Sequence, residues 1–240
     1  MKTLVLVHGF MGGSLQWTGQ RDALGDEYNV ITPDLPGYGE NAHLAAPDNI
    51  IDFAKWVLAD LSDKGVEKFH VLGHSMGGMI VQEMARLAPE RVGRLILYGT
   101  GAIGVLPGRF ESIGVSKERA RADGPRATAR RIAATWFLER EAASAYAECA
   151  AIAERSSLQA MNSGLTAMQE WSGLSYLPDV AQKTLVIWGD HDRTYPWSQT
   201  EQLWQSIKDA DLAVIPGCAH AVHLEKPHLF NTVLGEFLKS

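Results

Sequence analysis

Short apolar runs alternate along the chain with stretches that carry apolar residues at helical spacing. Six runs are continuous in β-branched and aliphatic residues, which is typical of strands buried on both faces of a parallel sheet. They cover residues 3–7, 30–32, 69–72, 94–98, 184–188 and 212–215. Helices are predicted over residues 16–24, 49–64, 76–88, 197–207 and 226–238. This alternation predicts a doubly wound, mainly parallel six-stranded α/β sheet.

Two of the helical stretches carry clear start signals. In the stretch from residue 49 to 64, apolar residues recur at spacings of three and four, and either Asp48 or Asn49 can cap the first turn. The last stretch opens with Pro227, which suits the first turn of a helix. Its apolar positions, Phe230, Val233, Leu234 and Phe237, predict one buried face.

The alternation of strands and helices is interrupted between residues 107 and 177. No convincing strand occurs there, whereas helical patches are predicted over 128–138, 142–154 and 158–171. A segment of this length is too long for a simple loop. The sequence therefore predicts a helical insertion, which we call the cap segment (residues 107–177), in an α/β core formed by residues 1–106 and 178–240.

A glycine-flanked serine lies between the third strand and the helix that follows it, in Gly73-His-Ser-Met-Gly77. A sharp strand-to-helix turn places its central residue in a strained backbone conformation, and side chains two residues away would collide with the neighbouring chain. Gly73 and Gly77 remove both clashes. The pattern predicts a nucleophile elbow that exposes the Ser75 hydroxyl, with the Met76 N–H pointing toward a developing oxyanion.

Four motifs in order, His8-Gly9-Phe10, Gly73-His-Ser-Met-Gly77, Gly189-Asp-His-Asp192 and Gly217-Cys-Ala-His220, resemble those of the α/β-hydrolase family. The resemblance covers nearly the whole chain. It implies the strand order 2-1-3-4-5-6 and a helical cap over the site. The sequence departs from many members in starting at the strand that ends in His8-Gly9, so we expect no N-terminal hairpin. The resemblance also implies that the Phe10 N–H, after His8-Gly9, is the second oxyanion donor beside the Met76 N–H.

A serine nucleophile needs a base, and histidine has the pKa that suits taking and returning its proton. His220 follows the last strand and therefore reaches the same sheet edge as Ser75, with His223 as the alternative base. His74 is expected to pack beside the site. Asp192 follows the fifth strand and is the expected partner of His220, with Asp190 as the alternative acid. The order Ser75, Asp192, His220 is the order found in α/β-hydrolases.

The cap segment supplies candidate substrate contacts. Trp136, Met161 and Leu165 are the predicted substrate-binding residues of an apolar pocket roof, to which Phe137, Met168 and Trp171 are further candidates. Six arginines of the segment are candidates for holding a substrate carboxylate in a bidentate manner. They are Arg109, Arg119, Arg121, Arg126, Arg130 and Arg131.

Composition narrows the partners and the compartment. A net charge of −6 argues against nucleic acid or an anionic membrane as the main partner, and favours a small-molecule substrate. The two cysteines form neither a disulfide framework nor a metal-ligand pattern. We expect a cytoplasmic protein without a targeting or membrane segment, acting as a monomer or small homo-oligomer. The expected chemistry uses no metal and no cofactor.

The reaction class follows from the elbow and its partners. Ser75 excludes the family members that place an aspartate at this position, and Ala221 stands where the related hydroxynitrile lyases carry a lysine. Residues 102–104, 118–124 and 134–137 are similar to the early cap of 3-oxoadipate enol-lactonases. The prediction is a carboxylesterase or lactonase of the serine-hydrolase type. Hydrolysis of a C–C bond in a vinylogous diketone, or a triad-bearing receptor with little turnover, are the alternatives.

Overall fold

The computed structural model describes residues 1–108 and 111–240. Its centre is one sheet of six strands in the order β2-β1-β3-β4-β5-β6, and every neighbouring pair is parallel. The strands are β1 (Lys2–Val7), β2 (Tyr28–Ile31), β3 (Phe69–His74), β4 (Val92–Tyr98), β5 (Thr184–Gly189) and β6 (Ala210–Ile215). The predicted strand order is confirmed. Thr32 falls outside β2, whose pairing with β1 ends at Ile31.

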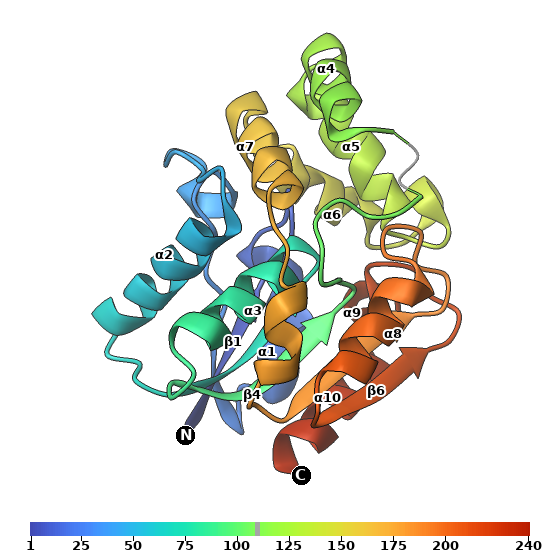
Figure 1. Ribbon diagram of the computed structural model, residues 1–240. Helices are drawn as coiled ribbons and strands as arrows, with labels where there is room; N and C mark the ends of the chain where they lie inside the picture. The colour runs from blue at the N-terminus through green and yellow to red at the C-terminus, as the bar shows by residue number, and fades with distance from the viewer. Residues whose placement is uncertain (109–110) are drawn as a thin grey trace.

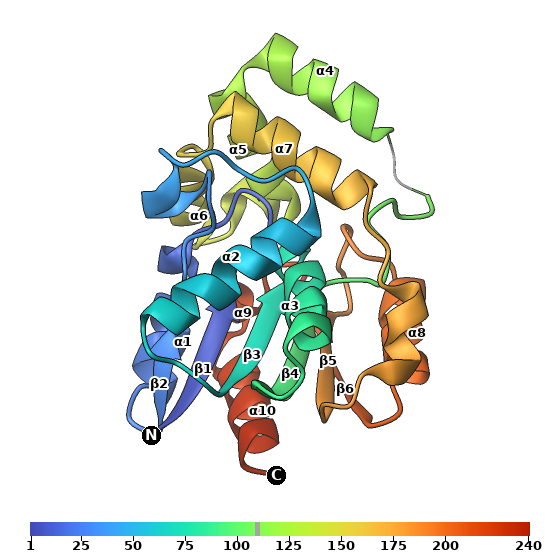
Figure 2. The ribbon, with the colours of Figure 1, turned by 60° about the vertical axis from the view of Figure 1, so that its left-hand side comes forward.

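Helices cover both faces of the sheet (Figures 1 and 2). Successive residues of each strand face opposite layers. Leu4 and Leu6 of β1 join one apolar cluster with Trp17 and Phe230, whereas Val5 and Val7 join the other. The first layer contains α1 (Thr18–Leu24) and α10 (Pro227–Lys239), and the second contains α2 (Ile50–Asp63), α3 (Met76–Leu87) and α8 (Trp197–Ser206). Burial on both faces explains why the central strands β1, β3, β4 and β5 lack alternation, whereas the edge strands β2 and β6 are only partly buried.

The structure places the predicted helix starts where capping groups are available. Asn49, rather than Asp48, caps α2, and its side-chain oxygen accepts the Asp52 N–H at 2.8 Å. Pro227 begins α10, as predicted. A short helix, α9 (Val222–Glu225), lies just before it, and the predicted helix over 16–24 divides into the 3₁₀ turn η1 (Ser14–Trp17) and α1.

The cap segment is helical and lies beyond the carboxyl ends of the strands, while both chain termini lie at the opposite end of the molecule (Figures 1 and 2). Its helices are α4 (Ile113–Asp123), α5 (Pro125–Thr135), α6 (Tyr146–Ala153) and α7 (Leu158–Gln169). The short 3₁₀ turns are η2 (Gly39–Asn41) in the core, η3 (Arg140–Ala142), and η4 (Leu174–Asp179) where the chain returns to the sheet. Helix α4 was not predicted, because its pattern of apolar residues is weak.

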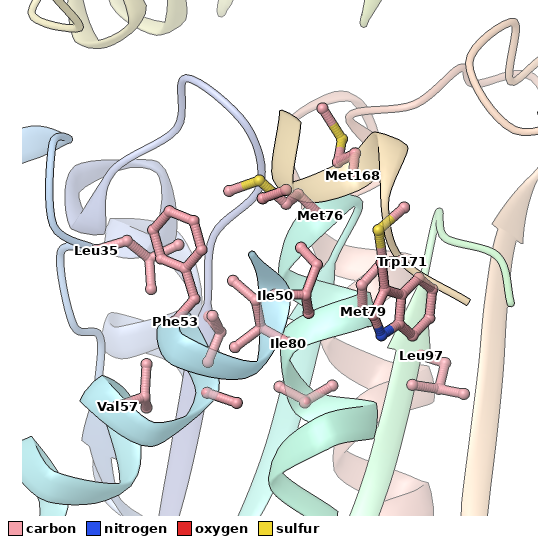
Figure 3. Close-up of a cluster of buried hydrophobic side chains, with 14 of the residues drawn as sticks. Leu35, Ile50, Phe53, Val57, Met76, Met79, Ile80, Leu97, Met168 and Trp171 are labelled. Carbon is pink, nitrogen blue, oxygen red and sulfur yellow. The ribbon is translucent and has the colours of Figure 1, made fainter. Parts of the chain in front are cut away.

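Two connecting segments link the cap segment to the core, where it also makes apolar contacts. The two connections are hydrogen-bonded to each other. Gly104 N–H donates to the Trp171 carbonyl at 3.1 Å, and Gly173 N–H donates to the Ala102 carbonyl at 2.8 Å, so the outgoing and returning chains run side by side. Met168 and Trp171 belong to the same buried cluster as Met76 and other residues of α3 (Figure 3). Among the described helices, none combines the length and apolar character needed to cross a bilayer.

Candidate active site

Ser75 sits on the turn between β3 and α3 with a strained backbone, at φ 57° and ψ −122°. A side chain at Gly73 would collide with the Gly77 backbone, and one at Gly77 would collide with the carbonyls of Val7 and His8. The neighbouring strand holds the turn, since Ser75 N–H donates to the Tyr98 carbonyl at 3.0 Å. The geometry expected of an elbow is therefore present at this position.

Two backbone amides lie beside the serine. Met76 is the first residue of α3, so its N–H has no partner within the helix. The Gly9–Phe10 loop approaches from β1, and a Cβ at Gly9 would lie 2.8 Å from the Ser75 Cβ. Within the described residues, neither the Phe10 nor the Met76 N–H donates a hydrogen bond. Unpaired backbone N–H groups beside a nucleophile are the donors from which oxyanion holes are built.

His8 fixes the loop that carries Phe10, a role that the sequence analysis missed. Its Nε2 accepts the Leu35 N–H at 3.0 Å, so the ring proton lies on Nδ1, which donates to the Gly9 carbonyl at 2.8 Å. Complete burial lowers the pKa of His8, and the ring is neutral as this pairing requires. The only signal in the sequence was its place directly before Gly9.

Asp192 and His220 form a buried pair at the same sheet edge. His220 Nδ1 lies 2.8 Å from Asp192 Oδ2, and both side chains are almost fully enclosed. The second carboxylate oxygen of Asp192 accepts the N–H groups of Thr194 at 2.7 Å and Tyr195 at 3.1 Å. Because the carboxylate only accepts, His220 donates from Nδ1, and this tautomer leaves Nε2 as a proton acceptor.

Ser75 and His220 line one small pocket of about 10 Å³, together with Gly9, Phe10, Gln16, His74 and Trp136. No hydrogen bond joins Ser75 Oγ to His220 in the described part of the chain. Such bonds are often long in ligand-free sites and tighten when substrate binds. The structure thus brings together the three predicted catalytic residues, with the Asp192–His220 link formed and the Ser75–His220 link open.

The alternative base, His223, is hydrogen-bonded to Tyr98 instead. Its Nδ1 lies 3.0 Å from the Tyr98 hydroxyl, and the Tyr98 hydroxyl donates to the His220 carbonyl at 2.8 Å. Burial lowers the pKa of His223 to about 3. His74 Nε2 donates to the same His220 carbonyl at 3.1 Å, and burial holds the pKa of His74 well below its usual value. His74 and His223 therefore support the His220 loop as neutral rings.

The alternative acid, Asp190, orders a turn instead. Its Oδ1 accepts the N–H groups of Gly217 at 2.8 Å and Cys218 at 3.4 Å. These contacts stabilise the turn that leads from β6 to His220. Asp190 forms no hydrogen bond with His220 within the described residues.

A cavity of about 390 Å³ opens between Ser75 and the cap segment. The predicted substrate contacts Trp136, Met161 and Leu165 all line it, and Met168 does so as well. Phe137 and Trp171 do not line this cavity; the indole N–H of Trp171 donates to Glu83 at 2.9 Å instead. The size suits a small organic ligand with its reacting group at Ser75.

One described cap arginine, Arg131, lines the cavity. Arg119 pairs with Glu111, whereas Arg126 and Arg130 pair with Glu154. Arg121 is exposed on α4, and Arg109 lies outside the described residues. Arg193, which follows Asp192, also lines the cavity and was not predicted.

A doubly wound parallel sheet with a serine elbow and a His–Asp pair at its carboxyl edge is the arrangement that characterises α/β-hydrolases. The family model described as alpha/beta hydrolase fold matches residues 2–227. The chain belongs to the alpha/beta hydrolase fold family, a family of hydrolase enzymes.

Relatives within this family act on different bonds. A putative carbamate hydrolase, RutD, of Azorhizobium caulinodans is 31% identical over 96% of this chain and 89% of its own length. A 2-hydroxy-6-oxononadienedioate/2-hydroxy-6-oxononatrienedioate hydrolase of Pseudomonas putida is 28% identical over 99% of this chain and 88% of its own.

Solved structures agree with the fold. A thermophilic esterase from Thermogutta terrifontis, in a malate-bound structure, has a TM-score of 0.90 at 27% identity and covers 100% of this chain and 90% of that one. The enol-lactonase from Burkholderia xenovorans LB400 has a TM-score of 0.91 at 22% identity, covering 100% and 92%. At this identity, the similarity to the enol-lactonase shows only that the two proteins share a fold.

Proposed function

We propose that this protein is a serine hydrolase that cleaves a small carboxylic ester or lactone through an acyl-enzyme. The observation that carries the proposal is the buried Asp192–His220 pair, which leaves His220 Nε2 as an acceptor in the pocket that it shares with Ser75. Ser75 is the nucleophile, His220 the base and Asp192 the residue that fixes the His220 tautomer.

In the first half of the reaction, Ser75 Oγ attacks the acyl carbonyl carbon while His220 Nε2 takes the hydroxyl proton. The N–H groups of Phe10 and Met76 hold the negative charge that develops on the carbonyl oxygen. When the tetrahedral intermediate collapses, the bond to the leaving group breaks and His220 returns the proton to it.

Water completes the reaction. It attacks the acyl carbonyl carbon, gives a proton to His220, and the acid leaves as His220 reprotonates Ser75. These steps balance without a metal or a cofactor. The cap segment acts as a lid in this proposal, and Trp136, Met161 and Leu165 hold the apolar part of the substrate. Their position around the cavity supports that role.

We further propose that the substrate of this hydrolase carries a carboxylate group. Arg131 is the described cap arginine on the cavity wall, and its ion pair with Asp123 is long, at 3.5 Å. A guanidinium with so weak a partner is available to a substrate anion. We also propose that the protein is a monomer or small homo-oligomer and that it acts in the cytoplasm. The two free cysteines, Cys149 and Cys218, support the cytoplasmic location, because thiols stay reduced there.

The second candidate is hydrolysis of a C–C bond in a vinylogous diketone by the same residues. It is favoured by the similarity over 99% of the chain to the Pseudomonas putida hydrolase, whose name describes an oxo-dienedioate substrate. A small-molecule receptor that retains the three residues is the other reading, and turnover separates it from an enzyme.

The test is pre-steady-state hydrolysis of p-nitrophenyl acetate and p-nitrophenyl butyrate. An acyl-enzyme predicts a burst of about one nitrophenolate per chain, followed by slower turnover. Ser75→Ala removes both phases, whereas Ser62→Ala, which alters an exposed serine near the end of α2, retains them. Unchanged turnover by Ser75→Ala would reject the assignment. A panel of esters, lactones and vinylogous diketones then identifies the bond, and binding without turnover of any of them would favour the receptor.

A further inference from the structure

Three consecutive residues of the cap segment, Trp136, Phe137 and Leu138, are hydrogen-bonded to the immediate neighbours of both Asp192 and His220. The Trp136 carbonyl accepts the N–H of Ala221, the residue after His220, at 2.9 Å. The cap segment therefore holds the His220 loop by a direct backbone bond.

Glu225 makes a second link between the same two segments. One carboxylate oxygen accepts the Leu138 N–H at 2.7 Å, and the other accepts the N–H of Ala219, the residue before His220, also at 2.7 Å. Short bonds from backbone amides to a charged acceptor are among the stronger hydrogen bonds in proteins. Glu225 thus joins the cap segment to one side of His220, and the Ala221–Trp136 bond joins it to the other.

Arg193 ties the loop of the acid to the same three residues. Its two terminal nitrogens donate to the carbonyls of Phe137 at 3.0 Å and Leu138 at 3.2 Å. Arg193 directly follows Asp192. The loops that carry the Asp192 carboxylate and the His220 imidazole are therefore both hydrogen-bonded to residues 136–138 of the cap segment. Trp136 also lines the cavity and the small pocket beside Ser75.

We infer that Glu225 is a positioning residue, which sets the distance of His220 from Asp192 and Ser75 by seating the His220 loop on residues 136–138 of the cap segment. The inference rests on the proposed function, because it concerns the same site. It makes the alignment of the catalytic residues depend on a correctly seated cap. Neither glutamate nor arginine touches the reacting atoms in this arrangement.

The chemistry of the carboxylate gives a sharp variant. Glu225→Gln retains one acceptor oxygen but turns an NH₂ group toward the other backbone N–H, so one of the two links is replaced by two facing donors. The matched control is Glu83→Gln. Glu83 is a buried carboxylate on α3 that also binds the cap, through the Trp171 indole, but it touches neither the Asp192 loop nor the His220 loop.

The experiment compares kcat, KM and the thermal midpoint of wild type, Glu225→Gln and Glu83→Gln with p-nitrophenyl butyrate. A displaced catalytic group costs about 10- to 100-fold in rate, so Glu225→Gln lowers kcat by that amount while KM changes less than about threefold. Glu83→Gln is expected to lower the thermal midpoint about as much as Glu225→Gln does. It retains kcat within about twofold, because the weakened bond between Glu83 and the Trp171 indole does not reach the reacting groups.

Equal kcat values for Glu225→Gln and Glu83→Gln, or a Glu225→Gln defect confined to KM, would overturn the inference. If Glu225→Gln does not fold, Arg193→Lys tests the same coupling, since a lysine cannot bind both carbonyls as the guanidinium fork does. It is expected to lower kcat more than it raises KM, and an unchanged kcat would again contradict the inference. Persistent activity in Ser75→Ala would instead reject the proposed function, so the two failures are distinguishable.

Discussion

Replacing Asp192 by asparagine forces His220 into the wrong tautomer. The Oδ1 position of Asp192 accepts two backbone N–H groups, from Thr194 and Tyr195. Asparagine keeps its carbonyl oxygen there, because turning the amide over would face its NH₂ toward both donors at a cost of about 1–3 kcal/mol each. Its NH₂ then points at His220 Nδ1, which must accept, and the ring proton moves to Nε2. A protonated Nε2 cannot take the Ser75 proton.

The expected loss is large and specific. A tautomer error of this kind in serine proteases lowers kcat by about 10⁴, which corresponds to about 5.5 kcal/mol of transition-state stabilisation at about 1.36 kcal/mol per factor of ten. We expect the same order for Asp192→Asn with p-nitrophenyl butyrate at neutral pH. Urea unfolding of the same preparation checks that the variant is folded.

Asp190→Asn is the matched control. The Asp190 oxygen that accepts the Gly217 and Cys218 N–H groups remains an acceptor in asparagine, so kcat is expected to change by less than about threefold. A folded Asp192→Asn variant that kept more than about a tenth of the wild-type kcat would contradict the tautomer assigned to His220. A larger loss of kcat in Asp190→Asn than in Asp192→Asn would contradict it as well.

Two further predictions concern pH and substrate charge. The folded-state pKa of His223, about 3, lies below its unfolded value of 6.5, so its contribution to stability is complete above about pH 6.5 and is lost as the pH falls toward 3. Between pH 7 and pH 5, urea unfolding is expected to show wild type losing about 2 kcal/mol more than His223→Asn, and parallel losses would contradict it. Arg131→Met is expected to lower kcat/KM for carboxylate-bearing lactones by about 10- to 100-fold and for neutral esters by less than about twofold, with Arg126→Met as the control. Equal effects on both substrate types would remove the carboxylate proposal.

Much of the fold was predictable, because the central strands β1, β3, β4 and β5 are buried on both faces and are therefore mainly apolar. Leu4 and Val5 of β1 pack against different helix layers, so an apolar residue is needed at both positions. The starts of α2 and α10 were predictable from single residues, the cap at Asn49 and Pro227 in the first turn. Helix α4 lacked such a pattern, since few of its residues are buried.

The candidate site was predictable where chemistry and chain position agree. Ser75, Asp192 and His220 each follow a strand, and parallel strands end at one edge of the sheet. His223 remained an alternative because it lies only three residues from His220, and only the start of α9 turns it toward Tyr98. Glu225 and Arg193 were missed, because their partners belong to a cap whose placement no local pattern encodes.

Peptide mass mapping of the enzyme, quenched in acid during the burst with p-nitrophenyl butyrate, identifies the acylated residue directly. We expect a butyryl group on Ser75, in the peptide that spans β3 and α3, at a level that matches the nitrophenolate released. No adduct is expected in Ser75→Ala. An acyl group on another residue, or turnover without any acylated peptide, would contradict the assignment of Ser75 as the nucleophile.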